Sequence, residues 1–303
     1  MPRILLTGAT GFIGRHCIEP LRSSGWQVLA VTSAAVDELP AAEGLSWHRA
    51  DLLDPRAPAE LIAQTRPDAL LHLAWHLAAS SVENYRWARA SLQLLMAFAE
   101  AGGRRAVLAG SCAEYDWLQE QPLDEQSRRR PATDYGISKN ALGELVEGYR
   151  TILGLSAAWA RVFFLYGPGE AETRLVASVI RALLAGEPAR STHGNQLRDY
   201  LYVEDVAGAL VKLVDSELEG AINIASGRSV RLRDLIAEVA TQLDRQQLVE
   251  LGAIAAHEHE APEVSADVTR LRRELDWQPA FDHRQGIARS IAWWRRQMAE
   301  ARR

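Results

Sequence analysis

The chain has 303 residues, which suits one large domain or a large domain with a smaller companion. It carries 34 Lys and Arg against 39 Asp and Glu, a net charge of −5 with both signs interspersed, so no nucleic-acid-binding or anionic-membrane surface is expected. An apolar content of 48% excludes an intrinsically disordered chain.

Cysteine usage and the N-terminal segment narrow the class of protein further. Cys17 and Cys112 are too few for a disulfide framework or a thiolate metal site, so no metal is expected and a reducing cytoplasm fits. No basic leader precedes the first apolar segment, and no apolar run approaches the roughly 18 residues of a membrane span. We therefore expect neither a targeting segment nor a membrane anchor.

Short apolar runs alternate with amphipathic stretches in the first half of the chain, which is typical of βαβ units and a parallel sheet. Strands are predicted at 4–6, 28–31, 69–73, 106–109 and 157–164, with helices at 12–23, 84–101 and 135–153. The second half is less regular, with helices predicted at 173–185, 206–214, 232–242 and 285–298 and strands at 200–203 and 221–224.

This pattern predicts an α/β fold with two parts. The first is a doubly wound, parallel-sheet Rossmann domain for dinucleotide binding over residues 1–166, to which residues 199–226 return. The second is a smaller α/β C-terminal lobe for the substrate, formed by residues 167–198 and 227–303.

A glycine-rich loop follows the first predicted strand and opens a helix. Gly8 suits a tight turn, Gly11 lets the backbone approach a pyrophosphate, and Gly14 allows close packing of helix on strand. The free N–H groups and the positive end of the helix dipole favour a bound phosphate. The loop therefore predicts a dinucleotide site, with Thr10, Phe12 and Ile13 also lining it.

The end of the second strand bears on the choice of dinucleotide. Sites that prefer NAD place an acid there, whereas this strand ends in Thr32 and Ser33, and Asp37 lies further into the loop. Thr32 and Ser33 can donate to a 2′-phosphate and Arg15 stands near, although Arg15 also suits a solvated first turn. We expect NADP(H), with NAD(H) as the alternative. Four further cofactor contacts are expected at strand ends, namely Asp51 and Leu52 near the adenine, and Leu73 and Ala74.

Tyr135 and Lys139 lie four residues apart on a predicted helix, so they share one face. A phenol titrates near 10 in water, and an adjacent ammonium lowers its pKa and lets it act as an acid or base. Ser111 follows a predicted strand at the edge where doubly wound sheets bind ligands, and its hydroxyl can orient a carbonyl. These three residues are the predicted catalytic set.

On these motifs the chain resembles the extended short-chain dehydrogenase/reductases, the group of nucleotide-sugar epimerases, dehydratases and ketoreductases. The likeness is close to full length and implies hydride transfer at C4 of the nicotinamide, a nucleotide-sugar substrate and a homodimer formed through a four-helix bundle. Its motifs come in the family's order: TGATGFIG at 7–14, HLA at 72–74, Ser111 with Tyr135 and Lys139, YGPG at 166–169 and RDYLYVEDV at 198–206.

Departures from the family pattern bear on the reaction. Dehydratases of the group carry an acidic pair directly after the catalytic hydroxyl, where this chain has Cys112 and Ala113. Glu114, directly before Tyr115, is more similar to the SSxEY segment of 4-keto-6-deoxy-sugar reductases. Together with Trp75, which ends another strand, Cys112 and Ala113 are expected to touch the substrate.

Other departures alter the expected substrate contacts. Ser91 stands where the family has a helix asparagine, and Phe164 stands at the asparagine of its RxxN segment. Arg198 matches a family arginine that reaches the diphosphate, but the second arginine expected before Asp267 is absent from 259–263. A nucleotide-linked substrate remains the expectation.

Three functions follow, in order of preference. The first is an NADP(H)-dependent reductase of a keto group on a nucleotide-linked 4-keto-6-deoxy sugar, with Tyr135 as proton donor. The second is an NAD-dependent nucleotide-sugar epimerase that uses the same Ser111, Tyr135 and Lys139. The third is a non-catalytic, dinucleotide-sensing regulator, which has no need of the Tyr135 and Lys139 pair.

Overall fold

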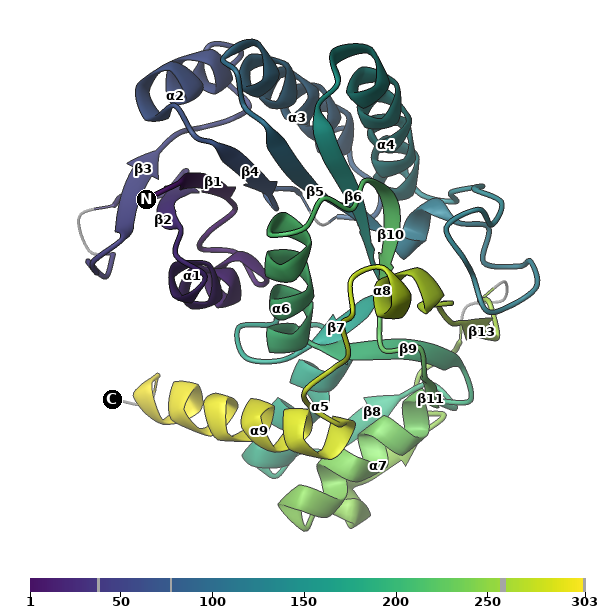
Figure 1. Ribbon diagram of the computed structural model, residues 1–303. Helices are drawn as coiled ribbons and strands as arrows, with labels where there is room; N and C mark the ends of the chain where they lie inside the picture. The colour runs from purple at the N-terminus through teal and green to yellow at the C-terminus, as the bar shows by residue number, and fades with distance from the viewer. Residues whose placement is uncertain (37–38, 77, 257–259, 302–303) are drawn as a thin grey trace.

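The computed structural model describes residues 1–36, 39–76, 78–256 and 260–301. Within these residues a seven-stranded parallel sheet runs in the order β10-β6-β5-β4-β1-β2-β3 (Figure 1). The chain builds the sheet outward in one direction from β1 and in the other direction from β4, so the strand order reverses between these two strands. A doubly wound sheet binds its ligand at this reversal point. The strands are β1 (Arg3–Thr7), β2 (Gln27–Thr32), β3 (Leu45–Arg49), β4 (Ala69–His72), β5 (Arg105–Ser111), β6 (Ser156–Val162) and β10 (Gly220–Ile224).

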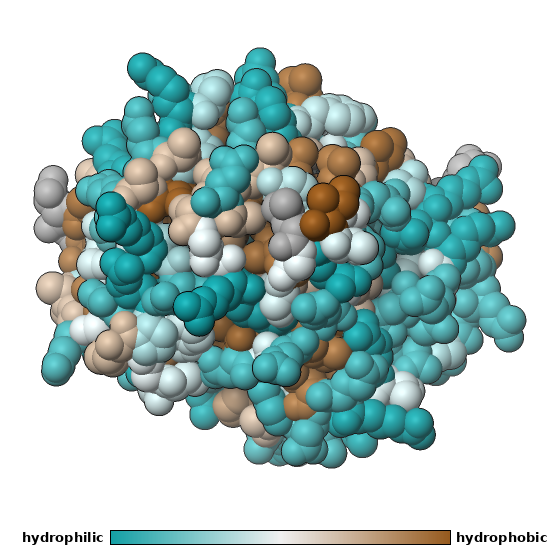
Figure 2. Space-filling model, turned by 45° about the horizontal axis from the view of Figure 1, so that its top comes forward, coloured by the Kyte–Doolittle hydropathy of each residue, from teal (hydrophilic) through white to brown (hydrophobic). Residues whose placement is uncertain are grey.

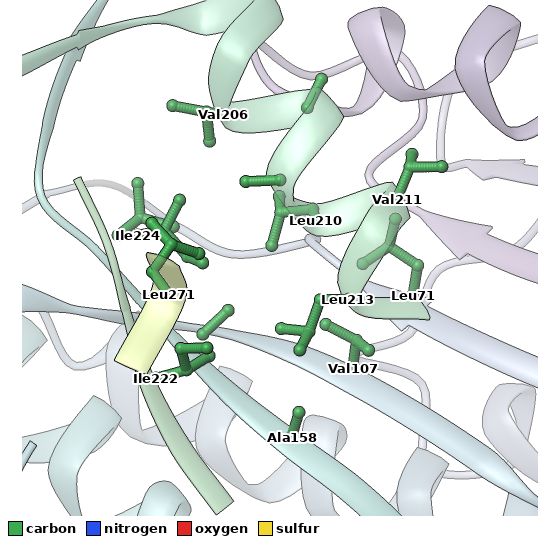
Figure 3. Packing of buried hydrophobic residues seen from close by; sticks show 14 of the residues in the cluster. Leu71, Val107, Ala158, Val206, Leu210, Val211, Leu213, Ile222, Ile224 and Leu271 are labelled. Carbon is green, nitrogen blue, oxygen red and sulfur yellow. The ribbon is translucent and has the colours of Figure 1, made fainter. Parts of the chain in front are cut away.

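Helices cover both faces of this sheet, so its central strands are buried on both sides and read as continuous apolar runs. One face carries α2 (Ala57–Thr65), α3 (Glu83–Glu100) and α4 (Asp134–Leu153), and the other carries α1 (Gly14–Ser23) and α6 (Val203–Val214). Figure 3 shows Leu213 of α6 beside Val107 of β5, with Leu71 and Ala158 of the neighbouring strands in the same cluster. This packing holds the strand ends that carry the predicted site in fixed register.

The C-terminal lobe has its own small sheet and its own core, which lies below the main sheet in Figure 1. In this sheet β9 (Leu197–Tyr202) pairs with β7 (Phe164–Tyr166), β11 (Ser229–Arg231) and β13 (Glu263–Val264). The remaining elements are the strand pair β8 (Ala189–Ser191) and β12 (Val249–Leu251), the helices α5 (Leu175–Ala185), α7 (Leu232–Leu243), α8 (Thr269–Arg273) and α9 (His283–Glu300), and the 3-10 turns η1 (Cys112–Glu114) and η2 (Gln246–Leu248).

The predicted α/β class, with a Rossmann-like parallel sheet and a smaller C-terminal lobe, is confirmed. One predicted strand is wrong: 157–164 breaks at Phe163, whose N–H donates to the carbonyl of Ile224 at 3.1 Å. There the chain leaves the large sheet, and β7 joins β9 in the small one. The expected division of the chain placed β7 and residues 199–202 with the Rossmann domain, whereas these strands pair within the small sheet.

Among the residues that the structure describes, no helix has both the length and the apolar character needed to cross a bilayer. Figure 2 brings the helices at the top of Figure 1 forward and shows brown patches among teal side chains. Exposed apolar side chains on α3 and α4 include Tyr85, Met96, Leu145 and Ile152.

Candidate active site

The glycine loop between β1 and α1 has the close backbone contacts that its sequence predicts. Gly8 has a φ of +68°, and a Cβ there would lie 2.8 Å from the Ala74 nitrogen. A Cβ on Gly14 would lie 2.1 Å from the Gly8 carbonyl oxygen, and Gly11 donates its N–H to the same oxygen at 2.9 Å. Helix α1 begins at Gly14 rather than at residue 12, which leaves Phe12 and Ile13 within the loop. The loop therefore fits the backbone cradle that a dinucleotide pyrophosphate requires.

The residues expected near the adenosine ribose lie side by side. The Thr10 and Thr32 hydroxyls are 3.1 Å apart, and Arg15 donates to the carbonyls of Thr10 and Gly11 at 2.7 and 3.1 Å. Thr32 is buried and Ser33 is exposed. Ser33 and Arg15 therefore both offer exposed donor side chains at this corner. Asp37, the nearest acid in the sequence, lies outside the described residues.

A buried histidine ties the two central strands to α3. His72 contacts the Thr7 hydroxyl through Nδ1 and the Ser91 hydroxyl through Nε2, both at 2.7 Å. Burial, followed by the charge of Lys139, lowers its pKa to about 3, so the ring is neutral at neutral pH. Ser91, which replaces the family's asparagine, therefore serves as the ring's partner.

Four expected cofactor contacts lie at the ends of β3 and β4. Thr7 accepts hydrogen bonds from the N–H groups of Leu73 and Ala74, which holds this segment beside the glycine loop. Leu52 is buried, whereas Asp51 is exposed and accepts from its own turn at Leu53. The hydrogen bond of Asp51 is the one that an aspartate in an ordinary turn makes, and its exposed carboxylate also leaves it accessible to a ligand.

Ser111 is the last residue of β5 and begins the turn η1. Its hydroxyl accepts from the Ala113 N–H at 3.2 Å, while the Glu114 carboxylate accepts from the Ser111 N–H at 2.7 Å. This reciprocal pair is a capping box, which the Ser-x-x-Glu spacing signals in the sequence. The turn therefore fixes the backbone that carries Ser111.

The Glu114 carboxylate is fully buried and is held by side chains of β6. It accepts from the Trp159 indole N–H at 3.0 Å and pairs with the Arg161 guanidinium at 2.8 Å. Arg161 also donates to the Tyr115 hydroxyl at 3.0 Å. The contacts of Arg161 and Trp159 with Glu114 could not be predicted from the sequence, because they join residues 45 or more positions apart and leave no local signal.

Tyr135 and Lys139 lie in the first turns of α4, which Thr133 caps by accepting from the Gly136 N–H at 3.1 Å. Burial raises the pKa of Tyr135 to about 12, and the hydrogen-bonding hydroxyl of Ser111 lowers it in part. The expected lowering by Lys139 is not found, and the Lys139 ammonium donates to the Ala109 carbonyl at 2.6 Å. The structure does bring Ser111, Tyr135 and Lys139 to one edge of the sheet.

Lys139 itself is 4% exposed. Burial lowers its pKa to about 7, and the Glu114 carboxylate raises it in part. Its Nζ lies 3.7 Å from the centroid of the Trp75 ring. Trp75, expected to touch the substrate, therefore contacts Lys139 directly and meets the edge of the Tyr135 ring at a centroid distance of 6.4 Å.

The other expected substrate residues lie near the same edge. Cys112 is buried, and burial raises its thiol pKa to about 12, so it is no acid at neutral pH; Ala113 follows it in the turn. Arg198 is buried and pairs with Glu260 at 3.0 Å, close to the position where a second arginine was expected. His259 of that segment lies outside the described residues. No motif in the sequence indicates a role for Arg174. This arginine is exposed, and its charge lowers the pKa of Tyr135.

Comparison with known proteins agrees with this fold. A family model described as "NAD dependent epimerase/dehydratase family" matches residues 4–225. A UDP-glucose 4-epimerase of Rhizobium meliloti is 26% identical, with 92% of this chain and 93% of the relative covered. A CDP-abequose synthase of Salmonella typhimurium is 25% identical over 94% of this chain and 95% of its own length.

Among solved structures, a Thermus thermophilus UDP-glucose 4-epimerase in complex with NAD superposes with a TM-score of 0.87. It is 25% identical, and the match covers 97% of this chain and 99% of that one. A NAD(P) dinucleotide is the cofactor typical of the matched family. The chain therefore belongs to the NAD dependent epimerase/dehydratase family and is an enzyme of that family.

Proposed function

We propose that this enzyme oxidises and reduces a ring carbon of a nucleotide sugar without eliminating water, and that its reaction is epimerisation. UDP-glucose 4-epimerases recur among the relatives, which favours this over the reductase that the sequence alone suggested. The proposed substrate is thus a UDP-hexose, with Ser111, Tyr135 and Lys139 around the reacting carbon.

The observation that carries the proposal is that neither of the two residues directly after Ser111 carries a carboxylate. Those two residues are Cys112 and Ala113, and the Glu114 carboxylate that follows them is buried and held by Trp159 and Arg161. Expulsion of hydroxide needs a positioned acid, which neither a thiol nor a methyl group supplies as well. An oxidation followed by a reduction needs no such acid.

Each residue then has a defined task. Tyr135 holds and moves the proton of the sugar hydroxyl, and Ser111 donates a hydrogen bond to the same oxygen. Lys139 places a positive charge one helical turn from the phenol. The bound dinucleotide supplies hydride exchange at C4 of its nicotinamide ring. The glycine loop holds the pyrophosphate, and Thr10, Ser33 and Arg15 surround the adenosine ribose.

A second candidate is the NADP(H)-dependent reductase of a nucleotide-linked 4-keto-6-deoxy sugar. Two observations favour it. Glu114 lies directly before Tyr115, as in the reductases that the motif resembles. Thr32 and Ser33 place two hydroxyls and no acid at the end of β2, with Arg15 beside them, which suits a 2′-phosphate.

One experiment separates these reactions. The purified enzyme is incubated with UDP-glucose, UDP-galactose and a dTDP-4-keto-6-deoxyhexose, each with NAD(H) and with NADP(H), and the products are identified by NMR and mass spectrometry. Interconversion of the two UDP-hexoses without net use of cofactor supports the epimerase. Stoichiometric oxidation of NADPH by the keto sugar favours the reductase, and loss of water from a UDP-hexose would contradict both.

A further inference from the structure

Lys139 has an unusual environment for a buried ammonium. Its Nζ donates to one backbone carbonyl, and no carboxylate forms an ion pair with it in the described part of the chain. The titratable groups around it are Glu114, whose charge acts from η1, the neutral His72 on β4 and Tyr135 on its own helix. A charged lysine at this depth therefore needs another source of stabilisation.

The Trp75 indole supplies the nearest candidate. Nζ lies 3.7 Å from the ring centroid, well inside the range at which an ammonium is attracted to the face of an aromatic ring, and tryptophan is the strongest partner. The Trp159 ring is more distant, at 5.9 Å. Replacing Trp75 therefore removes the larger part of this attraction.

A hydrogen bond from the Trp75 indole N–H holds the ring in place. This N–H donates to the Asn84 side-chain oxygen at 3.0 Å. Asn84 is completely buried, and its amide donates to the carbonyls of Ala78 and Ser81 at 2.7 and 3.3 Å. The Tyr135 N–H donates to the neighbouring Ala79 carbonyl at 3.0 Å. The loop after β4 thus fixes both the indole and the start of α4.

We infer that Trp75 is a positioning residue that keeps Lys139 protonated beside Tyr135. The inference rests on the proposed function only in giving Lys139 a catalytic task. Without the indole, Lys139 loses its proton at lower pH, and the phenolate of Tyr135 loses its neighbouring charge.

The lysine content of the chain allows a direct test in the protein without substrate or cofactor. Lys139 and Lys212 are its only lysines, so a sample labelled with ¹³C at lysine Cε gives two signals. Lys212 is exposed, donates to the Asp276 carbonyl and serves as an internal reference. Titration by NMR then yields the Lys139 pKa in the wild type, Trp75→Leu and Trp75→Phe.

We expect Trp75→Leu to lower the Lys139 pKa by about one unit, a tenfold loss of proton affinity, and Trp75→Phe to lower it by less than half as much. Trp26→Leu is the matched control, because that half-buried indole donates to Asp215 and has no contact with Lys139 among the described residues. It should leave the Lys139 pKa unchanged. An unchanged or raised Lys139 pKa in Trp75→Leu overturns the inference, as does an equal shift in Trp26→Leu.

The pH profile of activity gives the second readout. In Trp75→Leu the alkaline limb of kcat/KM, which reports the free enzyme, should move to lower pH by the shift measured in the NMR titration. A uniform loss of kcat/KM at every pH, with the alkaline limb unmoved, would instead indicate a structural role and contradict the inference. Failure of the proposed epimerase reaction would leave the NMR titration unaffected.

Discussion

Tyr135 lies four residues before Lys139 on α4, and its phenol hydrogen-bonds with the Ser111 hydroxyl. We expect Tyr135→Phe to bind NAD(P) with unchanged affinity and to lose about a hundredfold or more in kcat, because general acid–base catalysis contributes roughly 10²–10⁴. The measurement combines calorimetry with steady-state kinetics on the true substrate. A variant that turns over at near wild-type rates would remove Tyr135 from the reaction.

The depressed pKa of Lys139 also has a consequence for stability. The folded value of about 7 lies below the ordinary value of 10.5, so the cost of folding with this group is full below pH 7 and disappears as pH rises toward 10.5. We expect Lys139→Met to unfold at a higher temperature, with a gain of about 2–4 kcal/mol at pH 7 that shrinks toward pH 10. Thermal unfolding across that pH range checks it, and a gain independent of pH would contradict the assignment.

Ser33 is the exposed hydroxyl at the corner expected to meet the adenosine ribose. A carboxylate there repels a 2′-phosphate and accepts from the ribose hydroxyls. Ser33→Asp should therefore move the ratio of Kd values for NADP(H) and NAD(H) at least tenfold toward NAD(H). Ser24→Asp, on the C-cap of α1, is the charge-matched control. Equal ratios in the wild type and Ser33→Asp would show that Ser33 does not meet the cofactor there.

Several of these residues could be predicted from the sequence because their signals are local. Gly8, Gly11 and Gly14 follow a strand, and Tyr135 and Lys139 share a helical face. The contact of Trp75 with Lys139 could not be predicted, because it depends on how the loop after β4 meets α4. The pKa of Tyr135 was misjudged for the same reason, since burial is a property of the packed fold.

At the scale of elements, the turn η1 depends on a buried ion pair that lies beneath it. Glu114 and Arg161 are 0% and 3% exposed, so removing one partner leaves the other charge buried and unpaired. We expect Glu114→Gln and Arg161→Met each to destabilise the fold by about 3–5 kcal/mol. The double variant should lose less than the sum of the two. Urea unfolding of all four proteins measures the coupling, and strictly additive losses would show that the pair is not coupled.

A helix or strand could be predicted where the spacing of its apolar residues and the length of the segment both indicate the same element, as in α3 and β5. Helix α2 was missed because its nine residues carry no clear apolar stripe and begin with Ala57 and Pro58. The continuous apolar run at 157–164 hid the break at Phe163, because residues on both sides of the break are buried. The short strands β8, β12 and β13 form only through pairing with distant segments, so their sequences alone do not identify them.

At the scale of the whole molecule, α3 and α4 pack side by side and leave apolar side chains exposed on their outer surface. Ile137, Leu145 and Ile152 recur at helical spacing on α4, with exposures of 42%, 51% and 81%, and Tyr85 and Met96 lie on α3. We propose that this face pairs two copies of the chain. Leu145→Glu combined with Ile152→Glu should yield a monomer by light scattering where the wild type is a dimer. A wild type that is monomeric at micromolar concentration would contradict the proposal.

Strand β10 completes the parallel sheet from a distant point in the chain. β6 ends at Val162, and β10 does not begin until Gly220, after the first elements of the C-terminal lobe. At about 5–20 residues per second, a ribosome needs on the order of seconds to cover that interval. During this time the edge of β6 has no partner strand and is open to other nascent chains. The order of the elements in the chain therefore leaves this sheet edge exposed during synthesis, although the finished fold covers it.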